Sequence, residues 1–266
     1  MRAIRNTLTI AGKDIRVYLT TWMSYALFGF FLLMTAFFFT TLVEEYQRVS
    51  LQAAQQPWML EQLNLTDVVM GNVLRNVSVF FLFLLPLMTM RLFSEERKGN
   101  TLELLMTVPV RPSEIVLGKY LSALAIMTLM LALTLVFPLL LQVYGSTPGA
   151  GASPLDWRTI LTGYAGMWLL GAGFIAVGLF ASSLTDSQIV AAVISFSVLL
   201  LLFVVGYAAR GKEGFWQSAL EYLSLTNHLE DFVKGVVKVT GIVYYASLAF
   251  LGLFLTYRVV EAQRWR

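Results

Sequence analysis

Positions 17–43 read VYLTTWMSYALFGFFLLMTAFFFTTLV, a run of 27 residues without a charged side chain. An α-helix needs about 20 apolar residues to cross the roughly 30 Å of hydrocarbon in a bilayer, so this run predicts a membrane-spanning helix. Five further uncharged runs follow, at 76–90, 120–155, 159–185, 187–209 and 239–257. The run at 76–90 is long enough only if its helix begins near Val68. We therefore predict six spans, at about 22–43, 68–91, 115–143, 159–184, 188–209 and 239–258.

The composition is that of a membrane protein rather than of a soluble enzyme. Of the 266 residues, 58% are hydrophobic and 13% are charged, whereas a soluble domain carries about 25% charged residues. The chain has no cysteine and one histidine, which excludes disulfides, thiolate zinc sites and cysteine nucleophiles. We predict an all-α, polytopic membrane protein with a single transmembrane domain over residues 1–266, no metal site and no nucleic-acid partner.

The distribution of lysine and arginine predicts the orientation, because cytoplasmic segments carry an excess of both. With the N-terminus inside, the inner segments hold 12 of these residues and the outer segments hold seven. Acidic residues divide the other way, with seven inside and nine outside. We expect a multi-pass protein of the plasma or bacterial inner membrane with both termini in the cytoplasm.

The first 20 residues predict a short amphipathic helix ahead of the first span. Its apolar residues recur at helical spacing and are Ile4, Leu8, Ala11, Ile15 and Leu19. Arg2, Arg5, Lys13 and Arg16 add positive charge, so this helix is suited to lie in the cytoplasmic headgroup layer. The alternative is a basic tail that serves only to fix the topology.

The segment 94–112, between the second and third spans, is the most distinctive part of the chain. It lies within RLFSEERKGNTLELLMTVPVRPS, residues 91–113. Gly99 ends the preceding helix, and Asn100 with Glu103 forms a capping-box arrangement for a new one. Pro109 limits the new helix to about two turns. Its apolar face is predicted to meet either lipid or a groove on a soluble partner, and consists of Leu102, Leu105 and Met106.

This segment and both ends of the chain resemble one known family. EERKG at 95–99, TLELL at 101–105, PV at 109–110 and GK at 118–119 look like the cytoplasmic loop of ABC-2 type transporter permeases. KDIRVY at 13–18 resembles the N-terminal interfacial helix of these permeases. The tail is similar to the gliding-motility (GldF-like) branch, through HLEDF at 228–232, GVV at 235–237 and VYY at 243–245. The resemblance covers nearly the whole chain.

The resemblance implies the permease subunit of an exporter. Such a subunit pairs with a second permease subunit, identical or related, and is driven by two copies of a separate ATP-binding subunit, sometimes with an accessory subunit. The loop helix would be a coupling helix seated in the ATPase. The residues carried over as ATPase contacts are Glu95, Glu96, Arg97, Thr101, Leu102, Glu103, Leu105 and Met106.

The same resemblance implies that the chain is not itself an enzyme and holds no cofactor, since ATP and Mg²⁺ would bind to the partner ATPase. The sequence agrees with an external energy source. Its Gly-Lys pairs lie at 12–13, 118–119 and 211–212, and none is followed by the Ser or Thr of a phosphate-binding loop. The spans also lack interior ionisable residues, which weighs against a proton-driven transporter.

The outer end of the second span holds the candidate translocation-path residues. Asn72, Arg75 and Asn76 share one helical face there, and in the family this helix borders the path. The alternative is that Arg75 and the amides satisfy interfacial groups or carboxylates such as Asp67.

The outer segment 210–238 contains two amphipathic halves, for which we expect re-entrant or interfacial helices. Phe215, Ala219, Leu220 and Leu223 mark the first half. The second half is capped by Asn227 with Glu230, and its apolar residues are Leu229, Phe232, Val233, Val236 and Val237. His228, at the junction, is more often a capping or interfacial residue than a metal ligand.

Two other classes of function compete with a permease. A membrane enzyme such as a polyprenyl transferase needs paired acidic clusters, and the chain has no second cluster beside any of its acidic pairs. A non-enzymatic scaffold or a channel subunit without an ATPase partner stays open, although the spans show only scattered Ser and Thr rather than a polar pore stripe. Small residues at four-residue spacing in the fourth and fifth spans serve either packing within the subunit or a subunit interface, and include Ala172, Ala176, Gly178, Ser182, Ser187, Ala191 and Ser195.

Overall fold

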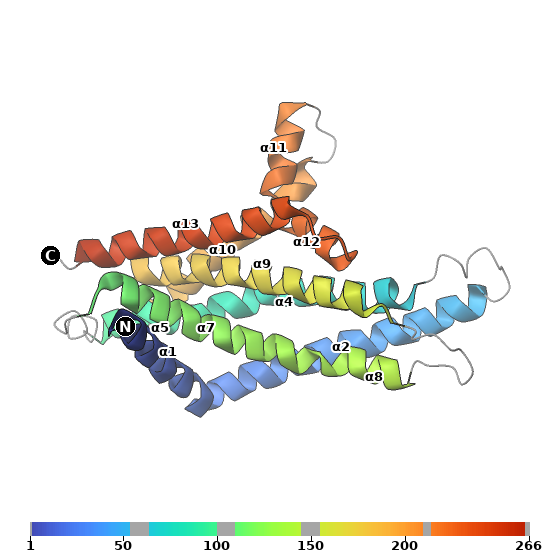
Figure 1. Ribbon diagram of the computed structural model, residues 1–266, viewed down its shortest axis with the longest axis horizontal. Helices are drawn as coiled ribbons and strands as arrows, with labels where there is room; N and C mark the ends of the chain where they lie inside the picture. The colour runs from blue at the N-terminus through green and yellow to red at the C-terminus, as the bar shows by residue number, and fades with distance from the viewer. Residues whose placement is uncertain (1, 54–63, 100–109, 145–154, 210–213, 264–266) are drawn as a thin grey trace.

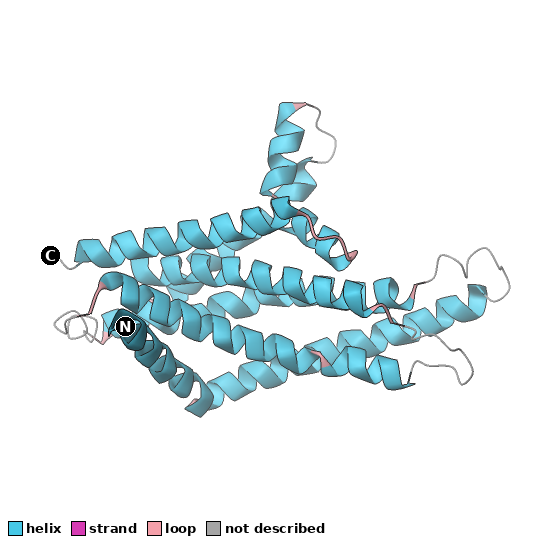
Figure 2. Ribbon diagram, in the orientation of Figure 1, coloured by secondary structure: helices cyan, strands magenta, loops and turns pink. Residues whose placement is uncertain are grey.

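The computed structural model of the chain describes residues 2–53, 64–99, 110–144, 155–209 and 214–263. Within these ranges every regular element is a helix (Figure 2). The elements follow the order α1 (Arg2–Thr20), α2 (Trp22–Ala53), the π-helix η1 (Thr66–Gly71), α4 (Asn72–Thr89), α5 (Arg91–Lys98), α7 (Pro112–Thr134), α8 (Val136–Tyr144), α9 (Trp157–Leu184), α10 (Gln188–Ala209), α11 (Phe215–Leu223), α12 (Leu225–Val233) and α13 (Val239–Gln263).

Six helical segments of the described chain are long and apolar enough to cross a membrane, which confirms the predicted all-α fold with six spans. They are Trp22–Gln52, Thr66–Lys98, Pro112–Tyr144, Trp157–Leu184, Gln188–Ala208 and Val239–Gln263. The second span begins at Thr66, two residues before the expected Val68, because the π-helix η1 extends α4 backwards. The described chain begins and ends at one end of the bundle, near α5 (Figure 1). We call this the proximal end, and the opposite end the distal end.

The helix α9 lies at the centre of the bundle. Buried residues make up 78% of its membrane window, against 17% for α2 and for α10. Small residues let neighbouring helices approach it closely. A methyl group on Gly252 of α13 would lie 2.8 Å from the carbonyl of Ala176, and Gly178 faces Thr89 and Ser195 in the same way. These members of the small-residue rows therefore pack within the subunit.

The helix α1 packs on the proximal end of α7, which it crosses at an angle (Figure 1). Ala11 and Tyr18 are buried, and Ile10 lies against Gly118 of α7. Ile4 and Leu8, from the predicted apolar face, are exposed. Part of the predicted apolar face of α1 thus packs against the bundle, and part of it is exposed. The position of α1 in a headgroup layer stays a prediction.

The segment between α10 and α13 forms two short helices, and α11 projects sideways from the bundle (Figure 1). The predicted cap at Asn227 is wrong. Ser224 is the N-cap of α12, and its hydroxyl accepts a hydrogen bond from the Asn227 N–H, so Asn227 lies inside the first turn. Val236 and Val237 lie beyond the end of α12 and are exposed, because Gly235 has a φ of +79° that the helix cannot continue through.

The close approach of α9 and α13 gives a test of this packing. Gly252→Ala places a methyl group against the backbone of Ala176, and overpacking of this kind costs about 1–3 kcal/mol. We expect a lower thermal unfolding midpoint, measured by tryptophan fluorescence in detergent. Gly29→Ala is the matched control, because no atom lies within 4 Å of its added methyl group. Equal midpoints for the two variants would contradict the close contact.

Candidate functional site

The second span breaks at Met90, at the proximal end, and Ser182 of α9 forms hydrogen bonds with the buried backbone groups there. Pro86 lies inside α4, and α5 starts one residue after the break. The Ser182 hydroxyl accepts hydrogen bonds from the N–H groups of Phe93 and Ser94, at 3.0 and 3.1 Å. It donates to the carbonyl of Met90 at 2.8 Å. The first turn of α5 is therefore fixed to the last turn of α9.

The far end of α5 is fixed to the same neighbour through Arg97. Its Nη1 donates to the carbonyl of Ser183 at 2.5 Å, and its Nε lies 2.6 Å from Oδ1 of Asp186, in the connection to α10. The helix ends at Lys98, as the predicted stop at Gly99 requires, and the Gly99 N–H donates to the carbonyl of Glu95. The segment 94–112 thus begins within α5, a short helix that is hydrogen-bonded to α9 in both its first and its last turn.

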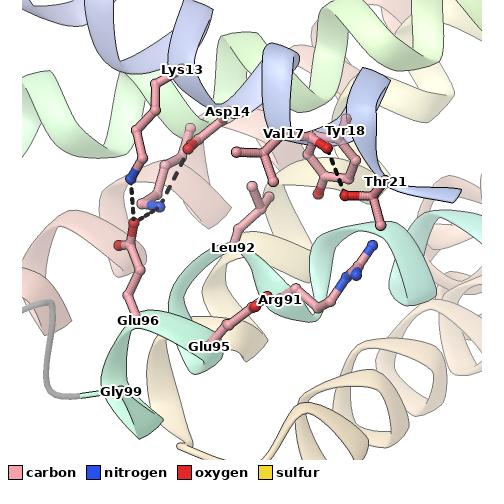
Figure 3. Close-up of a pocket in the computed structure, with 11 residues that line it drawn as sticks. Lys13, Asp14, Val17, Tyr18, Thr21, Arg91, Leu92, Glu95, Glu96 and Gly99 are labelled. Atoms are coloured by element: carbon pink, nitrogen blue, oxygen red, sulfur yellow. Dashed lines mark hydrogen bonds and ion pairs between the residues drawn. The ribbon is translucent and has the colours of Figure 1, made fainter. Parts of the chain in front are cut away.

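A buried ammonium joins α1, α5 and α7. The Lys119 side chain is 2% exposed, and its Nζ lies 2.8 Å from Oε1 of Glu96 and 3.6 Å from Oδ2 of Asp14. Lys13 approaches the same Glu96 oxygen at 3.6 Å (Figure 3). The Phe93 ring lies 5.2 Å from the Lys119 Nζ. Burial raises the pKa of Asp14, which the nearby Lys119 opposes. One cation therefore holds two carboxylates from two different helices.

The predicted ATPase contacts occupy different environments. Glu96 and Arg97 form ion pairs within the chain, whereas Glu95 is exposed and lines a cavity beside α1. The other predicted contacts, Thr101, Leu102, Glu103, Leu105 and Met106, lie outside the described residues.

Sequence reasoning quoted Asp14 and Lys119 only as parts of family-like motifs and did not predict their contact. A signal existed, since a lysine that opens a 36-residue uncharged run, 120–155, needs a carboxylate nearby. Nothing in the sequence, however, selects Asp14 and Glu96 from the other carboxylates. The sequence pattern identifies Ser182 only as a small residue and does not predict its hydrogen bonds to α5.

At the distal end, Arg75 forms a two-point ion pair with Glu230 of α12. The distances are 2.8 Å from Nε to Oε2 and 2.7 Å from Nη2 to Oε1. Nη1 donates to Oδ1 of Asn72 at 2.9 Å, and Lys234 lies 3.3 Å from Glu230. The hydrogen bonds from Arg75 lower the pKa of Glu230 below its ordinary value. The alternative stated for Arg75, that it pairs with an outer carboxylate, therefore holds for its guanidinium, although the ion-pair partner is Glu230 of α12 and not the example Asp67.

A cavity of about 320 Å³ lies beside this ion pair, between α4, α10 and α12. Arg75 and Asn76 line it, together with Glu230, Asn227 and Tyr207. Asn72 does not line it, because its amide donates to the carbonyl of Val68 and its oxygen accepts from Arg75. Two of the three predicted path residues thus face a polar cavity, and the third positions the guanidinium.

His228 lies in a cluster of aromatic rings. Its ring stacks on Tyr244 at 4.5 Å between centroids, and Nε2 lies 3.0 Å from the carbonyl of Tyr222. Tyr244 in turn donates to the carbonyl of Leu223 at 2.6 Å. These contacts join α11 and α12 to the start of α13. Among the described residues, no group of three His, Cys, Asp or Glu side chains is placed to hold a metal ion.

The fold and these two clusters define the class: a helical multi-pass membrane protein with polar networks at the two ends of its bundle. The chain belongs to the ABC-2 family of transporter proteins, whose family model matches residues 8–260. The comparison with curated proteins finds no match. The family match covers all six spans and both clusters, so the chain is a membrane component of an ABC-2 transporter.

The Lys119 cluster predicts a large loss of stability when its cation is removed. Lys119→Met leaves the buried Asp14 without its counter-ion and Glu96 with only the more distant Lys13, and breaking a buried pair costs about 3–5 kcal/mol. We expect less folded protein after heating, measured as the monodisperse fraction on size-exclusion chromatography. Lys98→Met, at an exposed position, is the control. A Lys119→Met protein as heat-resistant as the control would contradict the burial of this charge.

The Arg75–Glu230 pair predicts a dependence of stability on pH. Because the folded state lowers the pKa of Glu230, the pair stabilises above the ordinary glutamate pKa of about 4.3 and loses this effect as the pH falls through the lowered value. At pH 7 the free energy of unfolding of the wild-type protein should exceed that of Arg75→Gln by about 1 kcal/mol, the value for a partly exposed ion pair. The difference in unfolding midpoint should shrink below about pH 4.3.

The exposed Arg158 supplies the matched control for this titration. Arg158→Gln should differ little from wild type at any pH. If the difference in unfolding midpoint between wild type and Arg75→Gln stays constant from pH 7 to pH 3, Glu230 is not the source of that difference.

Proposed function

We propose that this chain is the permease subunit of an ATP-driven exporter. It works as a dimer with an identical or related permease subunit and is driven by two copies of a separate ATP-binding subunit. The family match supports a transporter membrane component. The observation that carries the proposal is the fixation of α5, whose second half begins the segment 94–112, to α1, α7 and α9.

The proposed mechanism treats α5 as the base of a coupling loop. Closure of the two ATPases on ATP and Mg²⁺ moves the docked loop, and the apolar face of Leu102, Leu105 and Met106 makes the contact. Because Glu96 and Arg97 are bonded to Lys119 and Asp186, they position the loop rather than touch the ATPase. A displacement of α5 then acts on α7 and α9 through these bonds.

The proposed orientation places the proximal end in the cytoplasm of a cell with the protein in its plasma or inner membrane. The excess of lysine and arginine in the corresponding segments supports it. The distal cavity beside Arg75 and Asn76 then opens toward the outer side, as the exit of an export path requires. Because the tail is similar to the GldF-like branch, the substrates of motility-linked permeases are the first candidates to test as the cargo.

The coupling loop is tested by a charge placed on its apolar face. Leu102→Asp together with Leu105→Asp should leave the chain inserted in the membrane but release the ATPase, because two buried carboxylates would lack partners in the groove. The measurements are the amount of ATPase that co-purifies with the chain and the ATPase activity that the chain stimulates. We expect both to fall at least about tenfold.

Leu104→Asp is the matched control, since the helical spacing places Leu104 off the face of Leu102 and Leu105. It should keep the ATPase. Undiminished association in the double variant would refute the coupling assignment. A wild-type chain that co-purifies with no ATPase would favour a scaffold or channel subunit.

A further inference from the structure

The second span has two irregularities where α4 passes into α5. Pro86 has no N–H, so the carbonyl of Leu82 lacks the donor that would normally bond to it one turn later. The regular helix is interrupted again at Met90, although its φ of −54° and ψ of −30° stay helical. We call residues 82–90 the junction. Helices bend most easily at such points, so the junction would absorb a displacement of α5 unless other contacts stiffen it.

The helix α1 is bonded to the second span on both sides of Met90. On the α4 side, the Tyr18 hydroxyl donates to the carbonyl of Met88 at 2.6 Å. On the α5 side, Lys13 lies 3.6 Å from Oε1 of Glu96 (Figure 3). The buried ammonium described above joins α1 to the same carboxylate. One helix therefore holds α4 and α5 in a fixed relation to each other.

The Tyr18 hydroxyl acts inside the junction. The side chain is 7% exposed and belongs to the buried core of the bundle. A phenylalanine ring would fill the same space, but it could not bond to the Met88 carbonyl, which lies between Pro86 and Met90. From the side of α9, the Ser182 hydroxyl donates to the carbonyl of Met90. Two helices outside the second span therefore hold its junction.

The other half of α1 is fixed to α7. The Asn6 Nδ2 donates to Oε2 of Glu114 at 3.0 Å, and Ile10 lies against Gly118. Because α1 is held along its length, a displacement of α5 reaches Tyr18 through a fixed helix rather than through a loose end.

We propose that Tyr18 is a positioning residue for coupling. Its hydrogen bond to the Met88 carbonyl keeps the junction from bending, so that a displacement of α5 moves α4 as well. This role rests on the proposed function, in which a separate ATPase displaces α5. The helix α4 carries Arg75 and Asn76, which line the distal cavity. The Tyr18 bond thus connects the coupling loop to the candidate translocation path.

The stiffening of the junction is tested without an ATPase, by amide hydrogen exchange of the purified chain in detergent. Tyr18→Phe removes one hydroxyl and keeps the ring. We expect the amides of residues 87–93 to exchange about five- to tenfold faster, the effect of losing one ordinary hydrogen bond on a local opening. Tyr25→Phe is the matched control, because its exposed hydroxyl bonds only to the nearby carbonyl of Leu19. Unchanged exchange in Tyr18→Phe would overturn the proposal.

The role in coupling is tested on the full chain with its co-purifying ATPase. Because the chain has no cysteine, spin labels can be attached to cysteines that replace the exposed Phe83 of α4 and Phe250 of α13. In wild type we expect the distance between the labels to change when a non-hydrolysable ATP analogue binds. Tyr18→Phe should lose this change and keep the same amount of ATPase, whereas Tyr25→Phe should keep both.

The outcomes separate positioning from a structural role and from the coupling proposal. A structural role would reduce the amount of folded Tyr18→Phe protein but leave the distance change of the folded fraction intact, which would overturn the proposal. A wild-type chain that binds the ATPase without a change in label distance would also overturn it, and the coupling contact would stand. A wild-type chain that binds no ATPase would overturn the proposed function and this role together.

Discussion

The ammonium of Lys119 is the constraint on which the proximal end of the molecule depends. A cation that is 2% exposed persists only with counter-charges in place. The counter-charges, Glu96 and Asp14, come from α5 and α1. Neutralising one side chain therefore requires three helices to meet. Such pairs add little net stability over an apolar core, but removing one partner leaves an uncompensated buried charge.

The helix α9 connects this arrangement to the distal end. Its 28 residues span about 42 Å at the α-helical rise. At one end Ser182 is hydrogen-bonded to α5. At the other end, Gly163 lies against Leu74 of α4 and Gly166 lies against Phe232 of α12. These two helices contain Arg75 and Glu230. A single buried helix thus packs against α5 at one end and against α4 and α12 at the other, so helices from both polar clusters share one neighbour.

The sequence was sufficient to predict those features of the fold that a single local physical constraint determines. Hydrocarbon thickness fixes the length of a span, so six spans could be predicted from uncharged runs, and the glycine at position 99 correctly predicted the end of α5. Contacts between distant residues could not be predicted. Glu230 lies 155 residues from Arg75, so an outer carboxylate could be suggested as the partner of Arg75, but Glu230 could not be selected from the others. Ser224 and Asn227 are both good caps, and only the position of α12 selects Ser224. The coupling helix falls outside the described residues and stays a prediction.

The two clusters differ in how much a rearrangement costs. At the proximal end, removal of a partner from Lys119 leaves a buried charge, at about 3–5 kcal/mol. At the distal end, the side chains of Arg75 and Glu230 are 38% and 36% exposed, and separating such a pair costs about 1 kcal/mol or less because water replaces each partner. In the proposed mechanism, a force applied to α5 would therefore move the proximal helices together before it breaks their bonds. The distal pair, which borders a polar cavity, is where the same force can change contacts.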